Sequence, residues 1–307
     1  MGMFAISELG RTTVDTVRIG SGELKAWFAV RGAELVRLTY RDVDLLWHGD
    51  PVWWDFRAPL LFPVVGRSPE NAIRIDGHEH PMPPHGFARD RIFAVDVANP
   101  DGATFSLRAD DGSRRHYPFE FRLVVAATLD ATTLKIATTV ENAGDRPMPF
   151  QFGYHPGFVW PLPGAQRDRH VCRFEKAETA PTRRNDLPSG MLRPERFPAP
   201  LDGRTLTPTD KLFETGAVQF EKLASRRVWY GPADGRGLDI RFPDSPHLGV
   251  WTKPGAPFLC IEPWQGLAEV QGADGELARR PGTRILAPGE RADYRLETSV
   301  DVADPGS

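Results

Sequence analysis

Residues 292–300 read "ADYRLETSV", and this stretch alternates between two kinds of side chain. Charged and small polar residues occupy every second position, starting from Asp293. An extended chain repeats every two residues, so this alternation predicts a β-strand with one face toward a core. The residues that would share the core-facing side are Ala292, Tyr294, Leu296, Thr298 and Val300.

The same two-residue period recurs elsewhere in the chain. It runs through Leu134, Ile136, Thr138 and Val140 in "TLKIATTVEN", and through Leu238, Ile240 and Phe242 in "GLDIRFP". Residues 23–47 indicate successive short strands broken at Gly32 and at the Arg41–Asp42 turn. The 29 glycines and 29 prolines punctuate short strands, and no long segment shows helical periodicity. We therefore predict an all-β fold of the sandwich or barrel type.

Composition excludes several classes of function. With 40% hydrophobic residues, the 307-residue chain can build a sizeable core, and a net charge of -3 gives no basic footprint for nucleic acid or membranes. Cys172 and Cys260 stand in no metal or redox spacing, so we expect a reducing, cytoplasmic setting. Residues 1–10 show no signal-peptide pattern, and no apolar run reaches membrane-spanning length.

Residues 181–208 are the loosest part of the chain, rich in proline and arginine. They could be an interdomain linker. We favour a long excursion over one domain, because strand patterns of the same kind resume after it. Long loops in compact domains often border a site.

Histidines cluster between residues 78 and 85. On a strand, the rings of His78 and His80 would point the same way, which suggests a cupin-like metal pair. That motif needs a nearby carboxylate where Pro83 and Pro84 stand, so we favour a solvated turn with incidental histidines. His85 differs, since prolines restrict the backbone before it and a glycine follows it. It is either a histidine hydrogen-bonded within a loop or a ring held still for a ligand.

Two further stretches carry candidate acid–base groups. In "PFQFGYHPGFVWPLPG", His155 stands among aromatic residues, where partial desolvation would move its pKa. In "APFLCIEPWQGLAE", Phe258, Cys260 and Glu262 share one strand face, and a carboxylate on so apolar a strand needs a partner. The alternatives are a core histidine bonded to a backbone carbonyl and a salt bridge to arginine. The sequence has no phosphate-binding loop, dinucleotide fingerprint or nucleophile elbow.

Taken together, these segments resemble the aldose 1-epimerase (galactose mutarotase-like) family, and its LacX-type branch in particular. The matching elements appear in family order as "FPVVGR", "HGFARD", "FGYHPGF", "DKLF" and "CIEPWQG", between about Pro59 and Gly266. The resemblance implies one β-supersandwich domain over residues 1–307, built of antiparallel sheets with few short helices. A sugar would bind in an open groove on its face.

The resemblance also implies roles for single residues. His155 maps to the general acid on the ring oxygen, and Glu262 to the general base on the C1 hydroxyl. His85 maps to a ligand-contacting histidine beside the ring oxygen, while Arg67 and Asp210 map to residues that bind hydroxyls. In this interpretation the prolines fix the His85 ring, and Gly86 keeps the backbone out of the ligand's way. "SPENAIRI" after Arg67 and Tyr-His-Pro around His155 depart from the well-studied galactose mutarotases, which leaves the sugar open.

The sequence thus predicts an isomerase that interconverts the α and β anomers of an aldose, without metal or cofactor. One alternative is a mutarotase of an anionic sugar, such as a hexose 6-phosphate or a sulfonated sugar, with Arg74 and Arg89 as possible contacts. Others are a non-catalytic carbohydrate-binding protein on the same scaffold and a cupin-like metalloenzyme. We expect a small-molecule sugar as the partner, no nucleic acid or membrane, and a monomer or weak homodimer.

Overall fold

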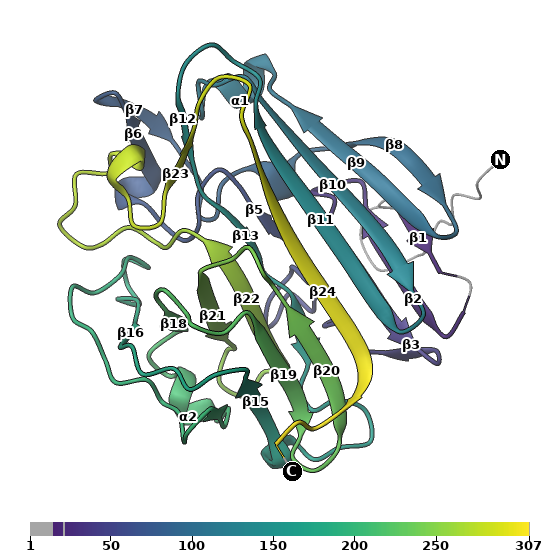
Figure 1. Ribbon diagram of the computed structural model, residues 1–307. Coiled ribbons are helices and arrows are strands. Elements are labelled where there is room, and N and C mark those ends of the chain that lie inside the picture. The colour runs from purple at the N-terminus through teal and green to yellow at the C-terminus, as the bar shows by residue number, and fades with distance from the viewer. Residues whose placement is uncertain (1–14, 21, 307) are drawn as a thin grey trace.

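The core lies between two antiparallel sheets whose strands come from distant parts of the chain (Figure 1). The computed structural model describes residues 15–20 and 22–306, so residues 1–10, with the prediction made on them, lie outside it. The nine-stranded sheet has the order β17-β15-β19-β20-β24-β11-β10-β9-β8. Its strands are β8 (Ala94–Asn99), β9 (Gly102–Arg108), β10 (Phe121–Asp130), β11 (Thr133–Asn142), β15 (His170–Phe174), β17 (Thr205–Leu206), β19 (Arg227–Pro232), β20 (Arg236–Arg241) and β24 (Arg291–Ala303).

The seven-stranded sheet carries the sequence motifs that suggested a site. Its order is β16-β18-β21-β22-β13-β5, and β14 also pairs with β22. The strands are β5 (Leu60–Leu61), β13 (Phe152–Tyr154), β14 (Gly157–Val159), β16 (Thr182–Arg183), β18 (Val218–Phe220), β21 (His247–Trp251) and β22 (Phe258–Gln265).

The remaining elements are short. A four-stranded sheet joins β1 (Thr16–Ile19), β2 (Leu24–Ala29), β3 (Leu35–Tyr40) and β4 (Val43–Asp44). Two antiparallel two-stranded sheets join β6 (Ala72–Ile75) to β7 (His78–Pro81) and β12 (Met148–Phe150) to the distant β23 (Arg284–Leu286). The α-helices of the described residues are α1 (Asp111–Arg114) and α2 (Asp210–Phe213). Single 3-10 turns are η1 (Pro69–Asn71), η2 (Ala88–Asp90), η3 (Arg167–Arg169) and η4 (Leu277–Arg279).

The predicted alternation is confirmed in the central strands. Along β24 the five residues assigned to the core are buried, and along β11 so are Leu134, Ile136, Thr138 and Val140. The breaks predicted in residues 23–47 fall between β2 and β3 and at the β3–β4 turn, where Arg41 and Asp42 have positive φ. In β20, Asp239 breaks the rule, since it is buried between the guanidinium groups of Arg227 and Arg241.

A buried tyrosine joins the two large sheets. The hydroxyl of Tyr154 on β13 donates to Thr138 Oγ1 at 2.8 Å and is 3.0 Å from the carbonyl oxygen of Tyr294, both on the nine-stranded sheet. The ring of Phe152 stacks on that of Tyr294 with centroids 4.9 Å apart. Phe152 and Tyr154 therefore face the core, and the residues between and after them, Gly153 and His155, face the opposite side of the sheet.

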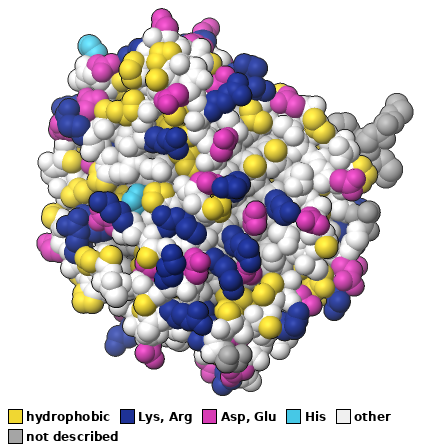
Figure 2. Space-filling view, in the orientation of Figure 1, with side chains coloured by type: hydrophobic (Ala, Val, Ile, Leu, Met, Phe, Trp, Pro, Cys, Tyr) yellow, Lys and Arg dark blue, Asp and Glu magenta, His cyan; other side chains and the backbone are white. Residues whose placement is uncertain are grey.

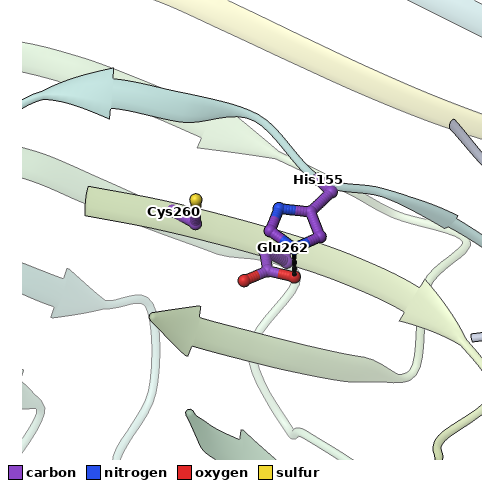
Figure 3. A group of neighbouring side chains, drawn as sticks. All are labelled: His155, Cys260 and Glu262. Atoms are coloured by element: carbon purple, nitrogen blue, oxygen red, sulfur yellow. Dashed lines mark ion pairs between the residues drawn. The ribbon is translucent and has the colours of Figure 1, made fainter. Parts of the chain in front are cut away.

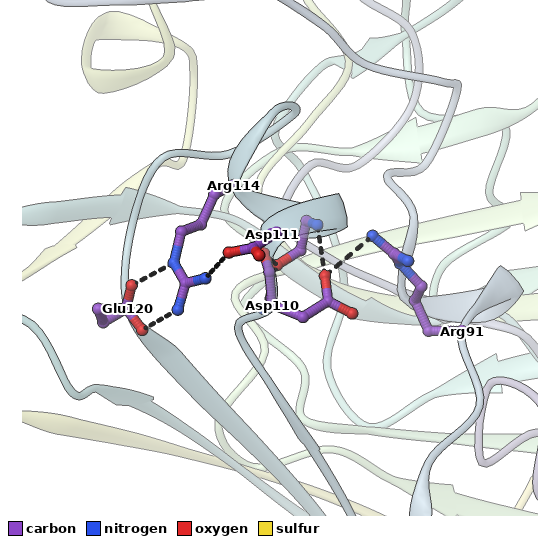
Figure 4. A network of polar contacts seen from close by, with 6 residues as sticks. Arg91, Asp110, Asp111, Arg114 and Glu120 are labelled. Carbon is purple, nitrogen blue, oxygen red and sulfur yellow. Dashed lines mark hydrogen bonds and ion pairs between the residues drawn. The ribbon is translucent and has the colours of Figure 1, made fainter.

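Helix α1 closes the corner between β9 and β10 (Figure 4). The Asp110 carboxylate accepts from the Ser113 N–H at 2.6 Å, and Ser113 Oγ accepts from the Asp110 N–H at 2.9 Å, which is a capping box. Arg114 then bridges Glu120 at 2.5 Å and Asp111 at 2.7 Å. A single helical turn is too short to be stabilised by packing of an apolar face. These local polar contacts stabilise it instead.

Cationic and acidic side chains intermingle on the face shown in Figure 2, which has the orientation of Figure 1. Ion pairs such as Arg295 with Asp244 and Lys135 with Asp130 lie at the solvent-exposed side of the nine-stranded sheet. Within the described residues, no helix has the length and apolar character needed to cross a membrane.

His247 on β21 makes stability depend on pH. Its ring is 5% exposed, Nδ1 accepts from the Lys222 N–H at 3.1 Å, and burial lowers its pKa to about 4. The unfolded chain binds a proton on this ring below pH 6.5, while the folded chain does so only near pH 4. Stability from this group is thus complete above pH 6.5 and is lost as the pH falls toward 4.

We expect the free energy of unfolding to fall by about 3 kcal/mol over this range on account of His247, at about 1.4 kcal/mol per pKa unit. His247→Asn keeps an acceptor for the Lys222 N–H but does not titrate, so its pH dependence should be shallower. Urea unfolding of both proteins at pH 8, 6, 5 and 4 measures this. Parallel curves for the two proteins would contradict it.

Candidate active site

The outer face of the seven-stranded sheet presents side chains in rows. Gln219 on β18 pairs in register with Gly249 on β21, and Gly249 pairs with Glu262 on β22. Residues in register across an antiparallel sheet project to the same side. In the next row, Trp264 on β22 lies between Gly153 and His247. Leu259 and Ile261 of β22 lie on the opposite face of the strand from Glu262 and belong to the core.

The predicted acid and base meet in the middle of this face. His155 directly follows β13, and its Nε2 lies 3.0 Å from Glu262 Oε2 (Figure 3). The two residues are 7% and 2% exposed, so the contact is almost dry. Burial of a carboxylate is costly without a partner, and here the partner is an imidazole rather than an arginine.

His85 stands beside this pair with its ring orientation fixed. The backbone N–H of His85 donates to the Gly66 carbonyl at 2.8 Å, and the ring Nδ1 of His85 accepts from the Gly66 N–H at 3.1 Å. Since Nδ1 accepts, the ring proton is on Nε2. Burial, together with the charges of His155 and nearby arginines, lowers the pKa of His85 well below 6.5. His85 is thus a neutral N–H donor whose ring lies 5.5 Å from that of His155.

The backbone at this turn corrects one expectation. His85 itself has a φ of 66°, a left-handed conformation unusual for a residue with a side chain. Gly86 was expected to leave room for a ligand. Instead, a Cβ at Gly86 would collide with the carbonyl group of Phe62, to which Gly86 is bridged. Glycine is required here because two backbone segments approach closely.

His85, His155 and Glu262 line one cavity of about 430 Å³. Arg67 also lines it, and so does Arg89, whereas Arg74 does not. Asp210 lies outside this lining: it accepts from Arg167 Nη2 at 2.9 Å and from the Gly255 N–H at 2.8 Å. The structure thus brings together four of the five predicted site residues and places Asp210 elsewhere.

The excursion over residues 181–208 reaches the cavity, where Asn185, Leu187 and Gly190 contribute to its wall. Apart from the short strands β16 and β17, this segment has no regular secondary structure. The loop therefore borders this cavity, in line with the expectation that it borders a site.

The aromatic part of the cavity wall was not predicted from the sequence. Trp54, Trp251 and Trp264 all line the cavity. The Trp264 ring extends over both neighbouring strands, and glycines there leave the space for it. A Cβ at Gly153 would stand 2.5 Å from Trp264 Cδ1, and one at Gly249 would overlap the six-membered ring. Gln219 was missed too, although it is only 3% exposed. The run "WWDF" at residues 53–56, unusually aromatic for a segment between strands, was an available signal.

Metal binding has one geometric candidate among the described residues. His155, Cys260 and Glu262 offer ligand atoms within 4.8 Å of one another (Figure 3). Burial and the nearby Glu262 charge raise the pKa of the Cys260 thiol well above 9, and a thiol must lose its proton to bind a metal. The donor types suit zinc, but this protonation state opposes it. His78 and His80 on β7 belong to no such group in the described part of the chain, and neither lines the cavity.

Comparison with known proteins identifies relatives of the whole fold. The sequence matches the Aldose 1-epimerase family over residues 15–299. The plasmid-encoded and chromosomal forms of protein LacX from Lactococcus lactis subsp. lactis are each 28% identical over 284 residues, which is 89% of this chain and 95% of theirs.

Solved structures show the same architecture. A galactose mutarotase-like protein from Lactobacillus casei ATCC 334 superposes with a TM-score of 0.87 at 27% identity, covering 93% of this chain and 99% of its own. A galactose mutarotase related enzyme from Lactobacillus acidophilus gives 0.86 at 28% identity, covering 94% and 98%. The expected galactose mutarotase-like fold, mostly antiparallel sheets with two short helices in the described residues, is confirmed.

We expect His85 to remain neutral between pH 6 and 8 and to carry its proton on Nε2. The reason is the Gly66 N–H, which occupies Nδ1, together with burial that lowers the pKa of the ring. Nitrogen-15 NMR of the labelled protein, with His85→Gln to assign the signal, distinguishes the two tautomers and the cation. A cationic ring, or one protonated on Nδ1, would show that this local geometry is wrong.

Proposed function

The chain belongs to the aldose 1-epimerase family, and from that premise we propose that it interconverts the α and β anomers of an aldose by acid–base catalysis. The observation that supports this most is the 3.0 Å contact between His155 Nε2 and Glu262 Oε2 at the cavity wall. Anomer exchange acts on two oxygens bound to a single carbon. An acid and a base that serve those two atoms have to lie next to each other.

In the proposed reaction Glu262 removes the proton of the C1 hydroxyl, while protonated His155 gives a proton to the ring oxygen. The bond from C1 to the ring oxygen breaks, and C1 becomes an aldehyde. Rotation about the C1–C2 bond presents the other face of the carbonyl group. The ring hydroxyl then attacks C1, returns its proton to His155, and the new C1 hydroxyl takes a proton from Glu262. Protons balance over the cycle, and no electrons are transferred.

The other proposed site residues orient the sugar. His85 Nε2–H, fixed by the Gly66 contact to Nδ1, is a donor that a ring oxygen or hydroxyl can accept. Arg67 lines the same cavity and supplies guanidinium donors. The indole of Trp264 offers an apolar surface to the C–H face of a pyranose. We propose that Asp210 instead holds Arg167 and the Gly255 turn, which it contacts.

Two neighbouring functions fit less well. Glycoside hydrolysis uses a pair of carboxyl groups about 5 to 9.5 Å apart. Glu262 is the single carboxylate among the residues that line this cavity. A purely sugar-binding protein needs no acid and base in contact, and burying an ionisable pair carries a desolvation cost that sugar binding alone does not require.

An anionic aldose is a second candidate, favoured by the charge of the cavity wall. Arg67 and Arg89 both line it, against the one carboxylate of Glu262. Arg89 also stands over the Phe56 ring at 4.6 Å and donates to the Pro84 carbonyl at 2.8 Å, so its position is fixed. Such a site attracts a phosphate or sulfonate carried on the sugar.

Glu262→Gln should lower the rate of anomer equilibration by about 10²- to 10⁴-fold, because the amide cannot take the C1 hydroxyl proton. The assay dissolves crystalline α-glucose, α-galactose or a hexose 6-phosphate and follows the anomers by NMR, with and without protein. Asp210→Asn is the control, since that carboxylate lies outside the cavity, and it should keep most of the activity. Unchanged turnover in Glu262→Gln would remove this residue from the mechanism, and a large loss in Asp210→Asn would return Asp210 to the site.

If the sugar is anionic, kcat/KM for a hexose 6-phosphate should exceed that for the neutral hexose and should fall with rising salt. Arg89→Gln should reduce that preference, while Arg74→Gln, outside the cavity, should not. Equal kcat/KM for both sugars, insensitive to salt, would leave the neutral aldose as the substrate.

A further inference from the structure

His155 lacks the contact that usually orients a histidine in an acid–base site. Its Nε2 faces Glu262, but its Nδ1 is out of contact with water and has no hydrogen-bond partner among the described residues. In most such sites a carbonyl or carboxylate accepts from this second nitrogen and stabilises the cation. Here the protonated ring would have a buried N–H without an acceptor, so another group has to stabilise it.

Aromatic rings occupy the space around His155. The indole of Trp54 lies against it, with centroids 4.8 Å apart and planes inclined by 30°. Trp251 presents itself at 88°, with centroids 6.0 Å apart. The near-parallel arrangement of Trp54 places the negative face of an indole against the imidazole, which is the geometry of a cation–π contact.

We propose that Trp54 is a positioning residue for His155: its indole face packs against the plane of the imidazole, holding the ring against Glu262 and favouring its protonated form by a cation–π contact where no described residue accepts from Nδ1. This inference rests on the proposed function insofar as His155 acts as an acid. It adds a residue to the site that neither the motif pattern nor the family match assigns.

Trp54 is itself held from several sides. Its carbonyl accepts from the Trp47 indole N–H at 2.8 Å, and its own N–H donates to the Asp50 carbonyl at 2.9 Å. Its ring stacks on Phe258 with centroids 5.5 Å apart. Gly157 makes room for it, because a Cβ there would stand 3.0 Å from Trp54 Cζ3.

The end of the Trp54 segment is pinned by a buried carboxylate. Glu34 Oε1 accepts from the N–H groups of Arg57 at 2.7 Å and Ala58 at 3.0 Å. A segment fixed at Trp47, Asp50 and Glu34 has little freedom to withdraw its indole. The packing of the Trp54 indole on the His155 ring is therefore fixed by the fold and is not one rotamer of a mobile loop.

Other charged groups near His155 define what the indole adds. Glu262 at 3.0 Å favours the cation, whereas the arginines of the wall, Arg67 and Arg89, oppose it by charge, and the neighbouring His85 ring is neutral. The Cys260 thiol is neutral, since burial raises its pKa. The indole face therefore adds an attraction for the cationic form of the His155 ring.

The test compares Trp54→Leu with Trp53→Leu and Trp54→Phe. Trp53 is the adjacent residue, packs on the same aromatic cluster and does not line the cavity, so its variant reports any general disturbance of the segment. Leucine keeps an apolar cover without a π face, and phenylalanine restores a weaker one. The first readout is the titration of the His155 Cε1–H signal by NMR, assigned with His155→Asn. The second is the pH profile of kcat/KM.

In Trp54→Leu we expect the His155 titration and the alkaline limb of kcat/KM to move down by about 0.5 to 1.5 pH units. Trp54→Phe should shift less, and Trp53→Leu should not shift either quantity. An unchanged titration in folded Trp54→Leu, or an equal shift in Trp53→Leu, would overturn the proposal. A change confined to KM would also overturn it, by making Trp54 only a sugar contact. The NMR titration needs no turnover, so absence of mutarotase activity would count against the proposed function and not against this inference.

Discussion

The contact between His155 and Glu262 depends on the alternation of two strands that pack on the same core. Tyr154 is tied into that core by hydrogen bonds from its hydroxyl to the nine-stranded sheet, so the next residue has to face outward. Ile261 is likewise buried in the core, and Glu262 after it faces the same outer side. Core packing one residue away thus determines where the proposed acid and base meet.

The outer face of this sheet can hold a cavity because glycines alternate with large aromatic residues on it. Gly153 and Gly249 leave the space over which the Trp264 indole extends, and Gly157 leaves the space for Trp54. Side chains at those glycine positions would displace rigid rings and so reshape the wall around Glu262. The result is a cavity with an aromatic wall that also holds the buried contact between His155 and Glu262.

Much of this arrangement was predictable from sequence, because its signals are local. Two-residue alternation identified β11 and β24, and it placed Glu262 on the same face of β22 as Phe258 and Cys260. What was missed depends on pairing between distant strands. Gln219 joins the site only through its register with Gly249, and Trp54 only because Gly157 lies opposite. Gly86 was misinterpreted for the same reason, since its close neighbour, Phe62, is far away along the chain. Asp210 matched a motif, but its partner Arg167 could not be read from the motif.

Direct contact between the proposed acid and base has a chemical consequence for a reversible reaction. After ring opening in the proposed mechanism, His155 has lost a proton and Glu262 has gained one, whichever anomer was bound. A distance of 3.0 Å lets that proton pass back from the carboxyl group to the imidazole without water. The pair can therefore return to its starting state even when the open-chain sugar departs before closing. Separated groups would need solvent for this step, which the 7% and 2% exposure of the two residues restricts. Burial and contact are thus coupled requirements. Burial strengthens the electrostatic interaction between His155 and Glu262, and direct contact lets the buried pair recover its starting protonation state without water.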